Sequence, residues 1–137
     1  MTHLERFIAL RRLRCFDTMN DDALVTLTEK TMERQWAPGE TICEPGALLE
    51  MVYFVIRGNV FFENDAGVSE ILGAPSLLFG LPVKKRLHAC PENGAVTLML
   101  SKAHFFTTIR QFPAMLLYLA KMTPEPVETD ADERRSD

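Results

Sequence analysis

Apolar residues follow a helical spacing near both ends of the chain and a strand-like pattern between them. Asn20 and Ser101 stand before two of the helical segments, and their short polar side chains can cap free N–H groups at a helix start. Pro113 separates the last two segments, because the residue before a proline is driven away from helical angles. The pattern predicts helices over residues 4–13, 20–33, 101–112 and 114–122.

Glycine and proline divide the middle of the chain into short segments. Pro38-Gly39 and Pro45-Gly46 are turn signals, and Gly58-Asn59 interrupts a long run of β-branched and aromatic residues. The part of that run over residues 53–60 has no wholly polar face, which indicates a buried central strand. We therefore expect an α+β fold, in which a small, jelly-roll-like β-roll at about residues 34–100 is flanked by helices from both ends. Its predicted strands are residues 40–44, 51–62 with a bend, 68–72, 76–79, 87–90 and 95–100.

Composition indicates one ordinary globular domain. The 137 residues are 47% hydrophobic and 25% charged, with a formal net charge of −4, so the chain lacks the basic balance typical of nucleic-acid binders. We expect a folded domain over residues 1–123 and an acidic, disordered tail over residues 124–137. We also expect a cytoplasmic protein, because no segment has the roughly 20 apolar residues of a membrane span and none resembles a secretion signal.

Candidate chemistry is sparse. His88 and Cys90 lie two residues apart in a predicted strand and would share a face, and they could share a metal or redox site with Cys15 or Cys43. Two ligands do not specify a site, so we expect no metal and no cofactor. No phosphate-loop, zinc-protease or nucleophile-elbow motif occurs, and we expect a protein that is not an enzyme.

The order of short motifs resembles that of cyclic nucleotide-binding domains, as found in catabolite-activator-type regulators, cyclic-nucleotide-dependent kinases and gated channels. The likeness covers roughly residues 10–122. It rests on Pro38-Gly39-Glu40, on Tyr53-Phe54-Val55 followed by Gly58 and Val60, on Leu72-Gly73, on Phe79-Gly80, and on Phe105 and Pro113. The resemblance implies the β-roll fold and a phosphate-binding cassette, which corresponds here to residues 80–89.

The cassette departs from the pattern that the resemblance implies. Leu81 stands where a glutamate would hold the ribose hydroxyl, residues 80–86 form a shortened loop, and Pro82 lacks an N–H donor. Arg86 is expected to be the phosphate arginine, although no Ser or Thr follows it. If a ligand is retained, its expected contacts are Gly80, Leu81, Arg86, His88 and Ala89.

These departures favour a regulatory or adaptor module that has lost ordinary cyclic nucleotide binding and binds another signalling or scaffold protein. The alternative is a sensor that holds a cyclic mono- or dinucleotide through Lys84, Lys85 and Arg86, and a thiol or metal sensor is a third interpretation. No helix-turn-helix follows the last helix, so we expect no DNA binding by this chain alone.

Two surfaces are candidates for the partner. The first is the cassette loop, where Leu81, Val83, Lys84, Lys85 and Arg86 combine apolar and basic side chains, unless Leu81 and Val83 turn inward and fill the vacant pocket. The second is the arginine-rich N-terminal helix, with Arg11 and Arg12. The oligomeric state stays open. The last helix is too short for a stable coiled coil, so any dimer is expected to use the barrel or the N-terminal helix.

Overall fold

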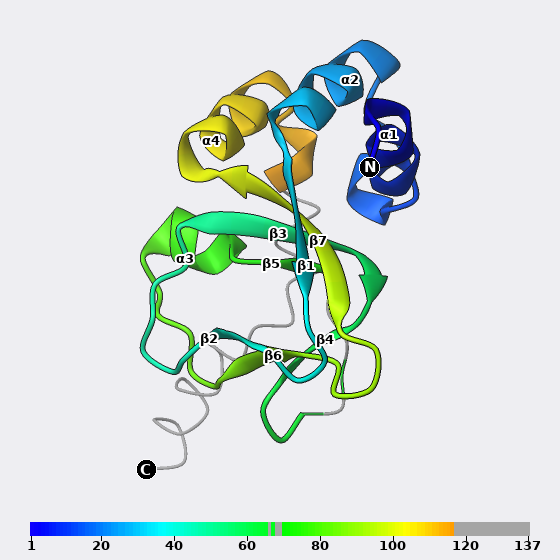
Figure 1. Cartoon of the computed structure of the whole chain (residues 1–137). Coiled ribbons are helices and arrows are strands. Elements are labelled where there is room, and N and C mark those ends of the chain that lie inside the picture. The colour runs from blue at the N-terminus through cyan, green and yellow to red at the C-terminus, as the bar shows by residue number, and fades with distance from the viewer. Residues whose placement is uncertain (66, 68–69, 117–137) are drawn as a thin grey trace.

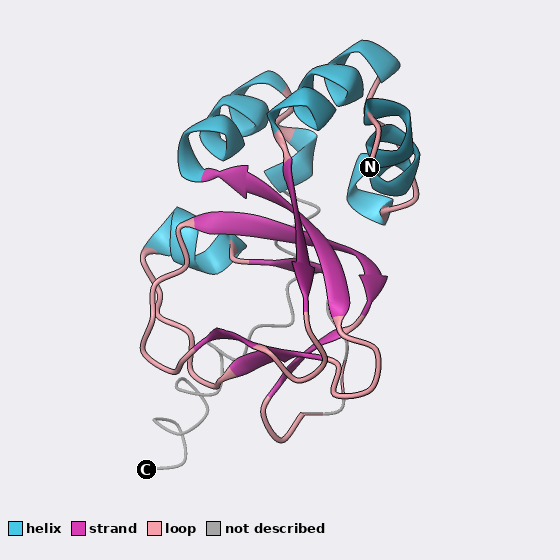
Figure 2. Cartoon of the chain, in the orientation of Figure 1, coloured by secondary structure: helices cyan, strands magenta, loops and turns pink. Residues whose placement is uncertain are grey.

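A computed structural model describes residues 1–65, 67 and 70–116 of the chain. Three helices, α1, α2 and α4, gather at one end, and the strands form a roll beside them (Figures 1 and 2). In chain order the elements are α1 (His3–Arg11), the 3₁₀ turn η1 (Arg14–Phe16), α2 (Asp21–Lys30), β1 (Met32–Trp36), β2 (Thr41–Cys43), β3 (Met51–Gly58), β4 (Val60–Phe62), β5 (Ile71–Leu72), α3 (Ala74–Phe79), β6 (Leu87–Ala89), β7 (Ala95–Ser101) and α4 (Lys102–Gln111).

The strands form two antiparallel sheets, which confirms the predicted α+β fold with a small β-roll. One sheet has the order β1-β7-β3-β5 and the other β2-β6-β4. The long strands β3 and β7 pair at the centre of the first sheet, with Val52 opposite Leu100 and Phe54 opposite Leu98. As predicted, β3 is a central strand.

Apolar side chains form two clusters, one on each face of the first sheet. Val52 and Phe54 of β3 point toward the helices and pack with Phe16, Leu24, Phe105 and other buried residues. Val55 points to the other side and packs inside the roll, with Trp36, Leu87 and their neighbours. Strand β3 is therefore buried on both faces, as its lack of a polar face predicts.

The second predicted helix, residues 20–33, ends earlier than the prediction. It ends at Lys30, and Thr31 already has extended backbone angles. Residues 32–36 instead form β1, which pairs with β7 at the edge of the sheet. An edge strand keeps polar side chains in solvent, so the mostly polar sequence of β1 gives no alternating signal, and tertiary pairing decides its structure.

The strand predicted over residues 76–79 is also wrong, because this segment belongs to helix α3. Pro75 lies in the first turn of α3, where a missing N–H donor costs nothing. Gly73 and Gly80 flank the helix with positive φ angles of 101° and 67°, which glycine adopts at little steric cost. The glycine and proline that suggested strand boundaries are therefore the start and stop of a short helix.

Other local predictions are confirmed. The Asn20 side chain accepts a hydrogen bond from the Ala23 N–H at 2.8 Å, and Ser101 caps α4 in the same way. Helix α4 ends at Gln111, two residues before Pro113.

Most of the last predicted helix and the whole of the predicted tail lie outside the described residues. In the part of the chain that is described, no helix has the length and apolar character that crossing a membrane requires.

Candidate functional site

The approach to the cassette is fixed by a close backbone contact and a side-chain hydrogen bond. A Cβ atom on Gly73 would lie 2.3 Å from the Met51 carbonyl oxygen, so only glycine fits between β5 and α3. After α3, the Ser76 hydroxyl donates to the Leu81 carbonyl oxygen at 2.7 Å, and the Gly80 N–H donates to the Ser76 carbonyl oxygen at 3.0 Å. These bonds hold the start of the cassette loop against its own helix.

Val83 fills the interior of the roll. Its side chain is 5% exposed and belongs to the cluster inside the roll. Its N–H donates to the Ala47 carbonyl oxygen at 2.8 Å, and its carbonyl oxygen accepts from the Gly46 N–H at 2.7 Å. Val83 therefore lies where the inward interpretation of the loop places it, and it does not present an apolar anchor to a partner. Leu81 is half-buried, whereas Phe79 is 71% exposed.

Arg86 lies on the outer face of the second sheet. Successive side chains in a strand point to opposite faces, and Leu87 and Ala89 point into the roll. The Arg86 guanidinium donates from Nη1 to Thr41 Oγ1 at 2.6 Å, and its Nε lies 3.6 Å from Glu63 Oε2. The structure thus pairs this arginine within the chain, and it separates Arg86 from Ala89, which was expected to share a ligand with it.

His88 and the cysteines do not converge. His88 is half-buried on the outer face of β6, where its ring centroid lies 6.1 Å from that of Phe61. Cys90 is buried just after β6, Cys43 lies on the neighbouring strand β2, and Cys15 lies in the cluster beneath the helices. Burial raises the pKa of Cys15 to about 12. Within residues 1–65, 67 and 70–116, no group of three His, Cys, Asp or Glu side chains is placed to hold a metal ion.

The two N-terminal arginines differ in their surroundings. Arg11 donates from Nη1 to the carbonyl oxygens of Phe16 and Met19, and from Nη2 to Asp21 at 2.5 Å, so it links α1 to the start of α2. It is therefore occupied within the chain. Arg12 is exposed, and no described residue forms an ion pair with it. Of this pair, Arg12 is the one available to another molecule.

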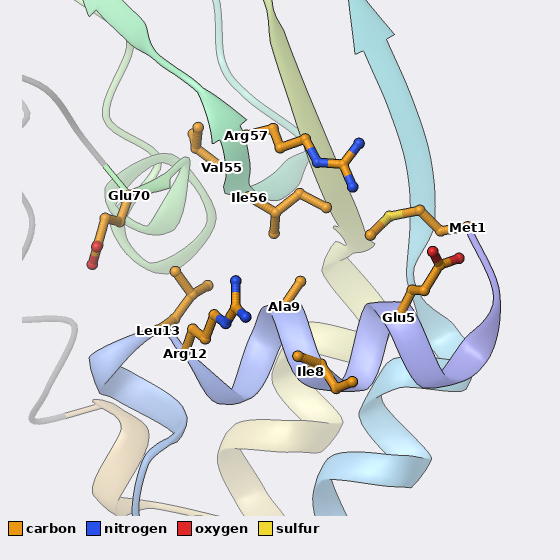
Figure 3. Close-up of a pocket in the computed structure, with 10 residues that line it drawn as sticks. All are labelled: Met1, Glu5, Ile8, Ala9, Arg12, Leu13, Val55, Ile56, Arg57 and Glu70. Atoms are coloured by element: carbon orange, nitrogen blue, oxygen red, sulfur yellow. The ribbon is translucent and has the colours of Figure 1, made fainter.

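A pocket of about 360 Å³ lies between α1 and the end of β3, and the sequence did not single it out (Figure 3). Glu5, Ile8 and Arg12 line it from α1, and Ile56 and Arg57 line it from β3. The pKa of Glu5 is lowered by hydrogen bonds with Thr2 and, more weakly, by the charges of the Met1 ammonium group and of Arg57. The N-terminal segment, the end of β3 and Glu70 lie far apart in the sequence, and only their packing in three dimensions identifies this pocket.

Comparison with known protein families and with curated proteins finds no match to this sequence. Solved structures, in contrast, share its fold. The regulatory domain of protein kinase A from Toxoplasma gondii, crystallised with cAMP, superimposes with a TM-score of 0.73 and 14% identity, over 87% of this chain and 49% of the other. For the regulatory subunit of a cAMP-independent protein kinase A from Trypanosoma brucei, the TM-score is 0.71 and the identity 14%, over 96% and 52% of the two chains.

The Thermus thermophilus catabolite activator protein gives a TM-score of 0.67 and 20% identity, over 89% of this chain and 61% of the other. The chain therefore has the fold of a cyclic nucleotide-binding domain. Among such proteins it resembles the regulatory domains of kinases and a bacterial activator, and it spans about half the length of the two kinase regulators described above.

Proposed function

We propose that this chain is a non-catalytic regulatory or adaptor domain that has lost ordinary cyclic nucleotide binding and acts by binding another protein. The observation that carries the proposal is the position of Val83. A side chain of the cassette loop occupies the interior of the roll, and its backbone is bonded to residues 46–47. A nucleotide seated in the cassette would have to displace this packing.

Several of the donors that an anion needs are also used or missing. A phosphate is held by free N–H groups at a helix start and by a cationic side chain. Here the N–H groups of Gly80 and Val83 donate to carbonyl oxygens of the chain, and Pro82 has none. The Arg86 guanidinium contacts Thr41 and Glu63 on the outer face. Each of these contacts would have to break before the cassette could solvate a phosphate.

One of the compared structures supports the idea that a domain with this fold can regulate without cAMP. The Trypanosoma brucei relative is described as the regulatory subunit of a cAMP-independent kinase. A regulatory domain of this fold therefore does not have to respond to cAMP. In this chain Val83 of the cassette is buried and Arg86 is paired within the chain, which argues against regulation by a nucleotide. We therefore favour regulation by a protein partner.

Calorimetric titration of the full chain with cAMP and cGMP tests the first half of the proposal. We expect no dissociation constant below about 100 μM, because the lost ribose carboxylate and the occupied donors together cost several kcal/mol, and each 1.4 kcal/mol is tenfold in affinity. The chain should also gain no thermal stability from a panel of cyclic mono- and dinucleotides, since a ligand that binds only the folded state raises the melting temperature.

Micromolar affinity that is lost when Lys84 and Lys85 are both replaced by Ala would contradict the proposal and support the sensor alternative. The adaptor half is tested by affinity capture with the tagged full chain, followed by reconstitution of the complex from purified components. A chain that binds a nucleotide tightly and reconstitutes no complex would contradict both halves.

A further inference from the structure

The outer side of α1 carries an apolar centre between two opposite charges. Glu5, Ile8, Ala9 and Arg12 follow the spacing of neighbours on one helical face. All four line the pocket between α1 and β3. Ile8 is 44% exposed, although the burial of a large aliphatic side chain lowers the free energy of the protein. This face is therefore an unpartnered stripe next to a groove.

The charges around the groove balance each other. Figure 3 shows Glu5 and Arg57 toward one end of the groove and Arg12 and Glu70 toward the other, with Ala9 between them. Two carboxylates and two guanidiniums balance each other in the lining, and the ammonium group of Met1, which also lines the pocket, is paired with Glu33 Oε1 at 2.9 Å. A small ligand with charge of one sign would meet its own sign at both ends, so the lining does not select an anion or a cation. It suits an occupant that carries both signs at matching positions.

We propose that the occupant is a second copy of this chain, packed with its α1 antiparallel to α1 of the first about a two-fold axis between residues 8 and 9. In such an interface the same patch serves both subunits, so each contact occurs twice. The axis places Glu5 opposite Arg12 of the partner subunit. It also places Ile8 over Ala9 of the partner subunit, where a short side chain leaves room for a larger one.

The local structure prepares α1 for this contact. Thr2 and Glu5 form a capping box, in which the Thr2 N–H donates to Glu5 Oε1 at 2.8 Å and the Glu5 N–H donates to Thr2 Oγ1 at 3.1 Å. Glu5 is thus held in one orientation and stays ionised. Arg12, at the other end, is exposed and forms no ion pair with a described residue. The proposal is independent of the lost nucleotide site, because α1 and the cassette are different surfaces.

Light scattering of the full chain measures the oligomeric state directly. At a protein concentration of about 100 μM we expect the mass of two chains, because a dimer with a modest interface is populated in this concentration range. Ile8→Glu should give the mass of one chain, because it places a carboxylate at the apolar centre. The matched control is Val25→Glu on α2, because Val25 is 46% exposed and Ile8 is 44% exposed. The control variant should remain a dimer.

A charge exchange separates the proposed pairing from a loss of folding. Glu5→Arg and Arg12→Glu should each be monomeric alone, because each places like charges opposite one another across the axis. Mixed in equal amounts, the two variants should form a dimer whose dissociation constant is at least tenfold lower than that of either variant alone. Circular dichroism of each variant checks that α1 still folds.

Three results would overturn the proposal: a wild-type chain that stays monomeric, a dimer that survives Ile8→Glu, or a mixture of the charge variants that fails to associate. A dimer broken by Val25→Glu and not by Ile8→Glu would assign the interface to the groove between α1 and α2. A monomer that dimerises only when residues 124–137 are removed would identify that acidic segment as the occupant, and would also overturn the second-copy proposal.

Discussion

The cassette loop and the outer face of α1 have similar side chains and opposite surroundings. Each places an aliphatic residue near arginine. In the loop, Val83 is 5% exposed and Arg86 contacts Thr41 and Glu63, whereas on α1 the side chain of Ile8 is 44% exposed and Arg12 lacks an ion pair with any described residue. The same combination of residue types is therefore part of the interior in one region and an open surface in the other.

The difference shows what decides whether such a pattern is a surface. The loop lies next to a turn whose backbone groups pair with Val83 and next to a strand whose side chains receive Arg86. Helix α1 lies beside the end of β3, and a groove remains between them. The neighbours in space, and not the residue types, separate an interior from a docking face. Substitutions at Val83 and Arg86, and a pH and alkylation comparison of Cys15 with Cys43, test how far the neighbours of a side chain decide its burial.

The largest effect is expected for Val83→Ser. The change removes methyl groups from the cluster inside the roll and buries a hydroxyl group, so the free energy of unfolding should fall by about 2–3 kcal/mol. Chemical denaturation of the variant and the wild type measures this difference. Val25→Ser is the control, because Val25 is 46% exposed and its replacement should change stability by less than about 0.5 kcal/mol. Equal effects at the two sites would remove the contrast between loop and surface.

The next effect concerns pH and compares the cluster beneath the helices with the edge of the roll. Burial raises the pKa of Cys15 to about 12, so the folded protein keeps the neutral thiol while the unfolded chain ionises near its ordinary pKa of 9.0. The stabilisation is complete below that value and is lost as pH rises toward 12.

Denaturation at pH 7 to 11, with Cys15→Ala as the reference, should show this extra loss only in the wild type. Alkylation gives a second measurement. Cys15 is buried and should react more slowly with iodoacetamide than half-buried Cys43 in the folded protein. Equal alkylation rates for the two thiols would show that the cluster beneath the helices opens as readily as the roll edge.

The smallest effect is expected for Arg86→Ala. The ion pair with Glu63 is partly exposed and long, at 3.6 Å, and the bond to Thr41 is a single charged hydrogen bond, so the loss of stability should be about 1 kcal/mol. Denaturation in dilute solution, where the proposed dimer is dissociated, measures it, with Arg12→Ala as a control that should be nearly silent. An Arg86→Ala variant with unchanged stability would show that the contacts of Arg86 with Glu63 and Thr41 do not stabilise the fold.

Much of the fold could be predicted from the sequence because its signals are local. Asn20 and Ser101 cap helices wherever they precede one, and the bend at Gly58-Asn59 needs only its own residues. Strand β1 could not be predicted, since its polar residues become a strand only through pairing with β7. Helix α3 did carry a signal, a proline in its first turn between two glycines, but glycine and proline also mark the boundaries of strands.

The candidate site was less predictable than the fold. The family resemblance implies that Arg86 and Ala89 share one ligand site, but strand alternation in β6 puts them on opposite faces, and the start of β6 at Leu87 decides which residue faces inward. The sequence also left the direction of Val83 open. The groove beside α1 depends on the distance between α1 and β3, which no local pattern encodes.

The burial of β3 on both faces has a consequence for strand register. A slip of one residue against β7 would exchange Val52 and Phe54 with their equally apolar neighbours, so hydrophobic alternation sets the alignment only weakly. A backbone contact at the end of the strand supplies the missing information: a Cβ atom on Gly58 would lie 2.3 Å from the Gly94 carbonyl oxygen. A slip that moved Arg57 or Asn59 into this place would create that clash. The alignment of the central strand is therefore encoded at its end and not along its length.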